Sequence, residues 1–388
     1  MKNSLQWKLW NLPFFDSRHK EIEFRLTAWR QNFPALEADI APLTLDEQCR
    51  AIACALGVSG LLAYAVPDTR QGQVVDVRSV SVIREALAYD SALVDFVFAM
   101  QGIGSAAIWR HGSNEMQETY LNGFRKGTRI AAFAMSEPEG GSDVASLSTT
   151  AQREGDQYVI NGVKTWISNG GIADQYIVIA RTEDMPGSKG LSALLVDADT
   201  PGLSIESRID IISPHPLATL RFDGCRVSAK RLLGEPGAGF KLAMGTLDTF
   251  RTSVGAAAVG IARRALDETL DRVRSRKIFG VQMSDMDTVR MKIADMTLDL
   301  EAAAMLVYRA AWLKDTTDMA VTREVALAKL GATEAAQRVV DSAVQLFGGT
   351  GVTVGSVIER LYRDVRPMRI YEGASEIQKL IIGKRMLS

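Results

Sequence analysis

The sequence predicts a protein of the α+β class in which a helical segment, a β segment and a second helical segment follow one another. Residues 17–126 carry the apolar spacing of helices and little strand-like alternation. From Arg129 onward, short runs rich in β-branched and aromatic residues alternate with turn residues. Helical spacing returns at Phe240. We therefore expect three domains, at residues 1–128, 129–238 and 239–388.

Composition narrows the possible functions. A chain of 388 residues with 47% hydrophobic residues can fill two or three domain cores. Its 45 basic and 46 acidic residues give a net charge of −1, which argues against an extended nucleic-acid interface. The three cysteines and three histidines show no metal-ligand spacing, so we expect no metal site and no disulfide framework.

We also expect a cytoplasmic protein without a membrane segment. Residues 1–15 show no targeting signal. No stretch approaches the roughly 18 consecutive apolar residues of a membrane span.

The first helical segment opens at Glu21. It continues in two long helices, over Val80–Leu93 and Phe96–Trp109, and Gly123 marks a later helix end.

The β segment contains one strong turn signal and two polar stretches. Asn161-Gly162, between two apolar runs, predicts a two-residue hairpin. Glu137–Asp143 reads as a rigid turn, because Pro138 fixes φ and the two glycines after Glu139 let backbone approach a ligand. It lacks the residues of a phosphate-binding loop or a dinucleotide fingerprint, and a simple domain-junction turn explains it equally well. Trp166–Gly171 ends a strand with an aromatic plane that could wall a flat ring, although a core Trp before an ordinary turn is as common.

The second helical segment predicts helices over 247–275, 287–313 and 322–346. Small residues over Gly255–Gly260 would let another helix approach closely. The basic turn Arg276–Gly280 closes the first of these helices, and cations at a helix C-terminus are common for dipole reasons alone.

One carboxylate, Glu372, stands in a constrained turn before the last helix. Ser375 and Gln378 have the spacing of a capping box at the start of that helix. The helix dipole favours the ionised form of Glu372, whereas burial would raise its pKa toward the range of a general base. An exposed acid beside a helix start is the alternative interpretation.

These stretches, in this order and at these separations, resemble the acyl-CoA dehydrogenase family over nearly the whole chain. The motifs that carry the resemblance are Met135-Ser136-Glu137-Pro138, Trp166-Ile167-Ser168-Asn169-Gly170, Arg276-Lys277-Ile278-Phe279-Gly280, Gln345-Leu346-Phe347-Gly348-Gly349 and Tyr371-Glu372-Gly373. The resemblance implies a middle β-barrel or sandwich domain and a C-terminal four-helix bundle.

The resemblance also implies FAD as cofactor. Met135 and Ser136 would meet the pyrimidine edge of the flavin, Ser168 would meet N5, and Trp166 would lie against the ring. Ser142 would lie near the pyrophosphate or the substrate. The residues implied to reach FAD across a subunit boundary are Arg276, Phe279, Gln345, Gly348 and Gly349. This arrangement requires at least a dimer, and the family habit is a tetramer.

By the same resemblance, Glu372 is the base that removes the α-proton of an acyl-CoA thioester while the β-hydrogen leaves as hydride to the flavin. The base's own amide N–H and a hydroxyl of FAD would hold the thioester oxygen. Arg251 and Gly373 would lie near the substrate, and electrons would pass to an electron-transfer flavoprotein. Some relatives carry the base on the long helix, where this chain has Phe250, which cannot serve.

The acyl pocket is expected to be floored by Leu93–Gly104, whose bulky Phe96 and acidic Asp95 suggest a short or unusual acyl group, although core packing would explain the same residues. The loop Ser213–Pro216 replaces an Arg-containing loop at the implied substrate entrance. Two other functions are considered: dehydrogenation of an acyl group on a carrier protein, and a flavin-bearing nucleic-acid-binding relative that no longer dehydrogenates.

Overall fold

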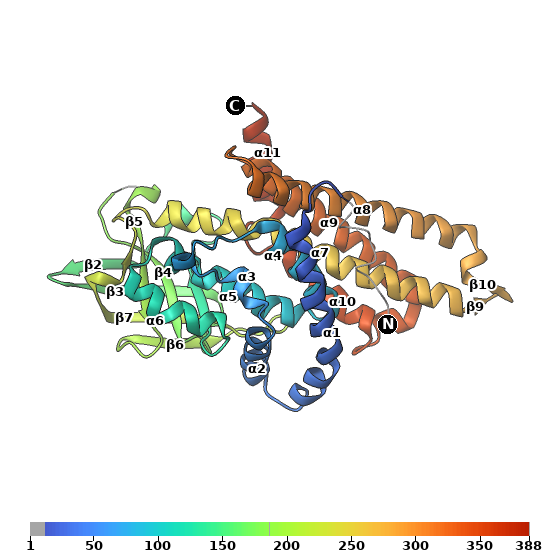
Figure 1. Cartoon of the computed structure of the whole chain (residues 1–388), viewed down its shortest axis with the longest axis horizontal. Coiled ribbons are helices and arrows are strands. Elements are labelled where there is room, and N and C mark those ends of the chain that lie inside the picture. Colours follow the sequence, from blue (N-terminus) through green and yellow to red (C-terminus); the bar gives the residue numbers. More distant parts are fainter. Residues whose placement is uncertain (1–11, 186, 388) are drawn as a thin grey trace. The chain divides into compact units, whose positions relative to one another are not determined.

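The computed structural model describes residues 12–185 and 187–387 (Figure 1). Most of the stretch in which we expected no targeting signal therefore lies outside the described residues. The predicted fold class is confirmed: helices precede and follow a β-sheet. The chain divides into two compact units, which we describe separately: a first unit of Met1–Leu26, Asp76–Asp95 and Arg251–Ser388, and a second unit of Thr27–Val75 and Phe96–Phe250. These units do not follow the three predicted domain boundaries, which stay a prediction.

The helices before the sheet match the predicted helical segment. Their starts are set by side-chain caps: Thr44 and Glu47 form a capping box, and Asp76 and Ser113 accept from backbone N–H groups of the helices they precede. These helices are α1 (Lys20–Ile40), α2 (Leu45–Val58), α3 (Leu62–Ala65), α4 (Val77–Asp90), α5 (Ala92–His111) and α6 (Asn114–Arg125).

Helix α5 is long and apolar enough, by length and composition alone, to cross a membrane. It is mostly buried inside the protein, as the core helix of a globular domain is. In the second unit, Gln101 on α5 accepts from the Ala131 N–H at 2.9 Å, and Gln175 donates to the Gly104 carbonyl at 3.1 Å. These bonds attach α5 to the sheet.

The second unit contains one eight-stranded sheet, shown in green in Figure 1. The strand order is β6-β7-β3-β2-β4-β5-β8, and β1 pairs in parallel with β4. Its core is formed by the long antiparallel ladder between β3 and β7 and by strands β4 and β5, which are buried except for their last residues. The strands are β1 (Ala131–Ala134), β2 (Thr150–Glu154), β3 (Gln157–Ser168), β4 (Gln175–Arg181), β5 (Leu191–Asp197), β6 (Leu203–Arg208), β7 (Leu217–Ser228) and β8 (Leu232–Leu233).

The hairpin predicted at Asn161-Gly162 is wrong. Both residues lie inside the continuous strand β3, where the register against β7 shifts between Ile160 and Gly162. Gly162 has φ 145°, and a Cβ on it would lie 2.6 Å from the Thr149 Oγ1. The glycine therefore serves a β-bulge and a close approach of β2 rather than a turn.

The first unit contains most of the helices that follow the sheet. Helices α8 and α9 pack along each other, and α9 also contacts α10 and α11 (Figure 1). The predicted small-residue face is confirmed: a Cβ on Gly260 would lie 2.2 Å from the Glu85 carbonyl oxygen of α4, and one on Gly255 would meet Val307 at 2.8 Å. The elements are α7 (Gly239–Ser275), the hairpin strands β9 (Lys277–Ile278) and β10 (Val281–Gln282), α8 (Asp287–Thr316), α9 (Thr322–Phe347), α10 (Val357–Val365) and α11 (Ser375–Leu387).

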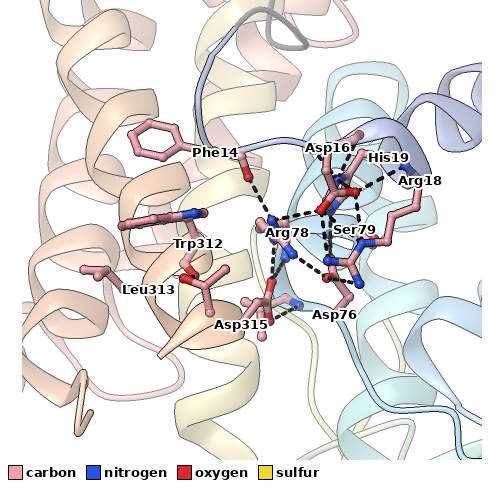
Figure 2. Close-up of polar contacts among 12 residues, drawn as sticks. Phe14, Asp16, Arg18, His19, Asp76, Arg78, Ser79, Trp312, Leu313 and Asp315 are labelled. Carbon is pink, nitrogen blue, oxygen red and sulfur yellow. Dashed lines mark hydrogen bonds and ion pairs between the residues drawn. The ribbon is translucent and has the colours of Figure 1, made fainter. Parts of the chain in front are cut away.

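A buried charge cluster joins three distant segments of the first unit (Figure 2). Arg78, at the start of α4, donates to the Phe14 carbonyl at 3.0 Å, to Asp76 at 3.1 Å and to Asp315 of α8 at 3.0 Å. Asp315 also accepts from the N–H groups of Val77 and Arg78. The arginine thereby ties the segment before α1 and the end of α8 to the helix α4.

Candidate active site

The turn that carries Glu372 is held in an unusual backbone conformation. Glu372 has φ 52° and Gly373 has φ 93°, so two successive residues occupy the left-handed region. Their carbonyl groups are fixed by side chains from three helices of the first unit. Arg251 of α7 donates to the Glu372 carbonyl at 2.9 Å. Lys329 of α9 and Gln378 of α11 donate to the Gly373 carbonyl at 2.8 and 3.0 Å.

The capping box predicted at Ser375 and Gln378 is wrong. Helix α11 begins at Ser375, and the carbonyl of Ala374 accepts its first backbone bond. The Ser375 hydroxyl instead donates to Glu334 of α9 at 2.6 Å, and the Gln378 amide turns back to Gly373. Both side chains therefore attach the turn to its surroundings and leave the helix N-terminus without a side-chain cap from Ser375.

The Glu372 carboxylate has a free, shielded oxygen. Its Oε2 is buried and has no hydrogen-bond partner in the described part of the chain, although the residue as a whole is only partly buried. Burial raises the pKa of Glu372 above its ordinary value, while the charges of Arg84, Arg251 and Lys329 act in the opposite direction. A buried carboxylate with an unused acceptor and a raised pKa has the properties of a general base.

A buried ion pair lies in the same electrostatic environment. Arg84 of α4 donates to both oxygens of Asp95 at 2.8 Å and to the Ser253 hydroxyl at 3.0 Å. Both charged side chains are almost completely buried. The Asp95 carboxylate adds to the rise in the pKa of Glu372, against the stronger effect of its Arg84 partner. Asp95 is thus paired with a cation and is not a free acid of the expected acyl pocket.

The predicted flavin contacts Met135, Ser136, Ser142, Trp166 and Ser168 all lie in the second unit. The Trp166 side chain is 58% exposed, because a bulge between Lys164 and Ile167 takes it out of the ladder at φ 58°. The hydroxyls of Ser136, Ser142 and Ser168 bond to no acceptor or donor among the described residues.

The sequence analysis did not predict how the turn Glu137–Asp143 is held in place. Glu137 accepts from the Ser148 N–H at 2.7 Å, from the Thr149 N–H at 3.0 Å and from the Lys164 ammonium at 2.7 Å. Burial is the largest influence on both charges and lowers the pKa of Lys164 to about 8, but the Lys164 charge and the hydrogen bonds outweigh it at Glu137, whose pKa falls to about 2. Lys164 also donates to the Met135 carbonyl at 2.9 Å. Glu137 is therefore a structural acid. It lies in the turn after β1, 27 positions before Lys164 of β3, and no spacing rule connects the two residues in the sequence.

The remaining predicted FAD contacts lie at one end of the first unit. Phe279, 93% exposed and at φ 50°, forms with Gly280 the two-residue turn between β9 and β10. Ile278 and Leu346 pack on one hydrophobic cluster with Val273, which brings this hairpin beside the end of α9. The side chains or backbone of these residues face solvent in the single chain: Arg276, Phe279, Gln345, Gly348 and Gly349.

Backbone strain marks the same motifs. Among the described residues, the non-glycine residues with positive φ are Trp166, Asn169, Phe279 and Glu372. Each belongs to a stretch that the sequence analysis singled out. Such conformations are costly and cluster at functional sites. Side-chain chemistry suggested these stretches, whereas no sequence pattern marks a bulky residue in the left-handed region.

Two further expectations concern the acyl pocket, both in the second unit. Phe250 is fully buried, and a Cβ on Gly102 of α5 would lie 2.6 Å from its ring, so the alternative position for a base is filled by an aromatic side chain. Phe96 lies with its ring centroid 4.2 Å from that of His215. Burial lowers the pKa of His215 to about 4, so this imidazole is neutral at physiological pH.

Comparison with known proteins identifies the family. Residues 35–128, 132–225 and 237–387 match the N-terminal, middle and C-terminal domains of acyl-CoA dehydrogenases. The chain is 39% identical over 335 residues to the mitochondrial short-chain specific acyl-CoA dehydrogenase of Rattus norvegicus, which covers 86% of this chain and 81% of the relative. The chain belongs to the acyl-CoA dehydrogenase family. It is therefore related to oxidoreductases.

Solved acyl-CoA dehydrogenases and their relatives share the fold. Butyryl-CoA dehydrogenase from Megasphaera elsdenii is 32% identical, with a TM-score of 0.87 over 96% of this chain and 99% of that one. A structure described as the electron transferring flavoprotein of Acidaminococcus fermentans is 32% identical, with a TM-score of 0.89 over 96% and 98% of the two chains. A third, described as PigA with FAD and proline, is 28% identical, with a TM-score of 0.88 over 96% and 98%.

The family is one of FAD-containing flavoproteins. Two features of this chain fit that cofactor. Trp166 is 58% exposed, and two residues further along β3 the Ser168 hydroxyl has no hydrogen-bond partner among the described residues, so both are available to a ligand. At Gly348 and Gly349 there is no atom within 4 Å of where a Cβ would be, so backbone there is open to a ligand. The contacts predicted for individual residues stay predictions.

Proposed function

We propose that this protein is an FAD-dependent dehydrogenase that converts an acyl-CoA thioester to the 2-enoyl thioester, with Glu372 as the base. The observation that carries the proposal is the shielded, unpaired Oε2 of Glu372 on a strained turn. Membership of the acyl-CoA dehydrogenase family supports the reaction class.

The protein's part in the reaction is to move one proton. The α-hydrogen of a thioester is weakly acidic, so a carboxylate removes it efficiently only in a site that excludes water and stabilises the developing enolate. The raised pKa of Glu372 makes it a stronger base than a solvated carboxylate. FAD, when bound, would accept the β-hydrogen with its electron pair.

The backbone of the same turn supplies a donor for the thioester oxygen. The N–H of Glu372 donates to no acceptor in the described part of the chain. A donor at the base itself would lie near the reacting carbon and could stabilise negative charge on the carbonyl oxygen. Arg251 and Lys329 keep that N–H and the carboxylate in a fixed mutual geometry through the carbonyl groups of residues 372 and 373.

We further propose a short acyl group as substrate and an electron-transfer flavoprotein as acceptor. The first rests on the short-chain and butyryl-CoA relatives and on the aromatic pair of Phe96 and His215 in the expected pocket region. The second rests on the structural likeness to a chain described with an electron transferring flavoprotein. We also propose that the protein is a homotetramer in the cytoplasm, in which Phe279 and its neighbours contact the FAD of another subunit.

Anaerobic reduction of the purified FAD-bound protein tests the function. Butyryl-CoA should bleach the yellow flavin absorbance, and the product should have lost two hydrogens by mass. Free butyrate is the matched control, because it lacks the thioester that acidifies the α-hydrogen, and it should leave the flavin oxidised.

A wider panel separates the alternatives. Longer, branched, aromatic and dicarboxylic acyl-CoAs define the substrate class. Bleaching by a carrier-bound acyl group but by no acyl-CoA would favour the carrier-protein reading. If no thioester bleaches the flavin, the protein is not a dehydrogenase, and the non-dehydrogenating relative becomes the better description.

A further inference from the structure

A buried lysine underlies the turn that carries Glu372. Lys329 of α9 is fully buried, and its Nζ donates to the Gly373 carbonyl at 2.8 Å. In the described part of the chain, no carboxylate is close enough to form an ion pair with it. A charged ammonium that contacts a backbone carbonyl and no counter-ion is an expensive arrangement, because burial removes its hydration.

A second buried cation binds the same turn as this lysine. Arg251 of α7 is 6% exposed and donates to the Glu372 carbonyl at 2.9 Å. The two cations therefore hold consecutive carbonyl groups in a turn whose two residues both have positive φ. A strained backbone conformation persists only where the surrounding structure fixes it, and the direction of the side chain on that backbone depends on it. The proton acceptor of the proposed reaction is that side chain.

We propose that Lys329 is a positioning residue for the base: by fixing the Gly373 carbonyl, it sets the direction of the Glu372 carboxylate. The proposal rests on the assignment of Glu372 in the proposed function. Its second effect is electrostatic, because the ammonium charge favours the ionised form of Glu372. Gln378 donates to the same carbonyl at 3.0 Å, so the turn keeps one partner when Lys329 is replaced.

Several charged groups surround the pair and set the sign of any pH effect. Burial lowers the pKa of Lys329 to about 8, and Glu372 opposes that change. Loss of the Lys329 charge removes one of the influences that lower the pKa of Glu372, so that pKa rises further. The groups that face Glu372 or Lys329 are Arg84 and Asp95 of α4 and α5, Arg251 of α7, Glu334 of α9, Tyr371, and Glu376 of α11.

Lys329→Met tests the positioning role without relying on activity. It keeps most of the side-chain volume but removes both the donor and the charge. Hydrogen–deuterium exchange of the FAD-bound protein should become faster at the amides of residues 372–376. Thr333→Val is the matched control: this fully buried hydroxyl lies one turn further along α9, donates to the Lys329 carbonyl at 2.9 Å, and forms no hydrogen bond with the Glu372 turn in the described part of the chain. It should leave exchange at residues 372–376 unchanged.

Kinetics then separate positioning from a merely structural effect. With butyryl-CoA as probe, flavin reduction by Lys329→Met should be roughly 10–100-fold slower, the cost of a misplaced catalytic group. In the pH profile of the flavin-reduction rate, the fall at low pH should move to higher pH in Lys329→Met. In Thr333→Val it should stay where it is in the wild type. Lys329→Gln, which is neutral but polar, is the second variant if the methionine does not yield FAD-bound protein, and its fall at low pH should move in the same direction.

The two possible failures are distinguishable. If the wild-type protein is reduced by no acyl-CoA, the proposed function is wrong, and the exchange experiment still decides whether Lys329 orders the turn. If exchange at residues 372–376 and the fall of the rate at low pH are both the same in Lys329→Met as in the wild type, Lys329 is not a positioning residue.

Discussion

At the scale of single residues, the account depends on how burial and charge balance at Glu372. Desolvation alone would protonate a buried carboxylate, and cations alone would make it a poor base. Here burial is the largest influence, and Arg84, Arg251 and Lys329 oppose it. The net effect is a raised pKa, so the ionised carboxylate is a stronger base than a solvated glutamate.

This balance predicts a pH dependence of flavin reduction. Only the ionised carboxylate can accept the α-proton, so the rate with butyryl-CoA should fall as the pH drops through the raised pKa of Glu372. The midpoint should lie above 4.5, the ordinary value for glutamate. Stopped-flow absorbance across pH measures it, with the substrate-free flavin spectrum as a control for cofactor loss. A midpoint at or below 4.5 would show that the carboxylate is not desolvated.

The same shift acts on stability with the opposite trend. Because the folded protein binds the Glu372 proton more tightly than the unfolded chain, this residue is least unfavourable to folding below its ordinary pKa. That advantage is lost as the pH rises through the raised value. Activity and stability at this residue therefore change in opposite directions with pH, as expected for a strained functional group.

At the scale of elements, most helix boundaries could be predicted from sequence, because the apolar residues of a helix recur with a regular period. The helices predicted over 287–313 and 322–346 are α8 (Asp287–Thr316) and α9 (Thr322–Phe347). The helix predicted from residue 247 begins earlier, at Gly239. Its first turns contain Gly239 and Gly245, which have low helix propensity, and packing decides the outcome there.

Turns could be predicted less well than helices, because the same dipeptide can adopt several backbone conformations. Asn161-Gly162 has the residues of a tight turn but sits in a bulge, since β3 continues to pair with β7 beyond it. The tight turn that does occur, at Phe279-Gly280, carries a bulky residue at φ 50° that propensity would not choose. Pairing between strands decides the backbone conformation in both cases, and a short stretch of sequence does not show which strands pair.

The sequence predicted the catalytic residue of the candidate site but not the residues that hold it in place. Glu372 was singled out as the base from its motif. The partners that hold its turn, Lys329 and Arg251, lie 43 and 121 positions away in sequence, so no spacing rule connects them to it. Glu137, in the turn after β1, and Lys164 of β3 lie 27 positions apart and are likewise brought together only by the fold.

At the scale of the whole molecule, buried charges hold distant segments together. The cluster around Arg78 joins the segment before α1, the start of α4 and the end of α8 in the first unit (Figure 2). Because α4 also carries Arg84, which acts on Glu372, this cluster supports the electrostatic environment of the site as well as the fold.

Arg78→Met tests that role. Removing this cation leaves the buried Asp315 carboxylate without its cation partner, which should lower the free energy of unfolding by about 3–5 kcal/mol. Arg18→Met is the matched control, because Arg18 pairs with Asp16 in the same cluster but is 64% exposed, and it should cost at most about 1 kcal/mol. Denaturant unfolding of the FAD-bound proteins measures both, and equal losses would mean that burial of the Arg78 charge is unimportant.

The central claim is that the carboxylate of Glu372 removes the substrate proton, and anaerobic flavin reduction by Glu372→Gln tests it most directly. The substitution keeps the shape and polarity of the side chain but removes the base, so the protein should retain FAD and lose butyryl-CoA-dependent bleaching by about 10³-fold or more. Glu37→Gln, which changes an exposed acid on α1, should bleach at the wild-type rate. Bleaching by Glu372→Gln at a rate close to that of the wild type would contradict the account.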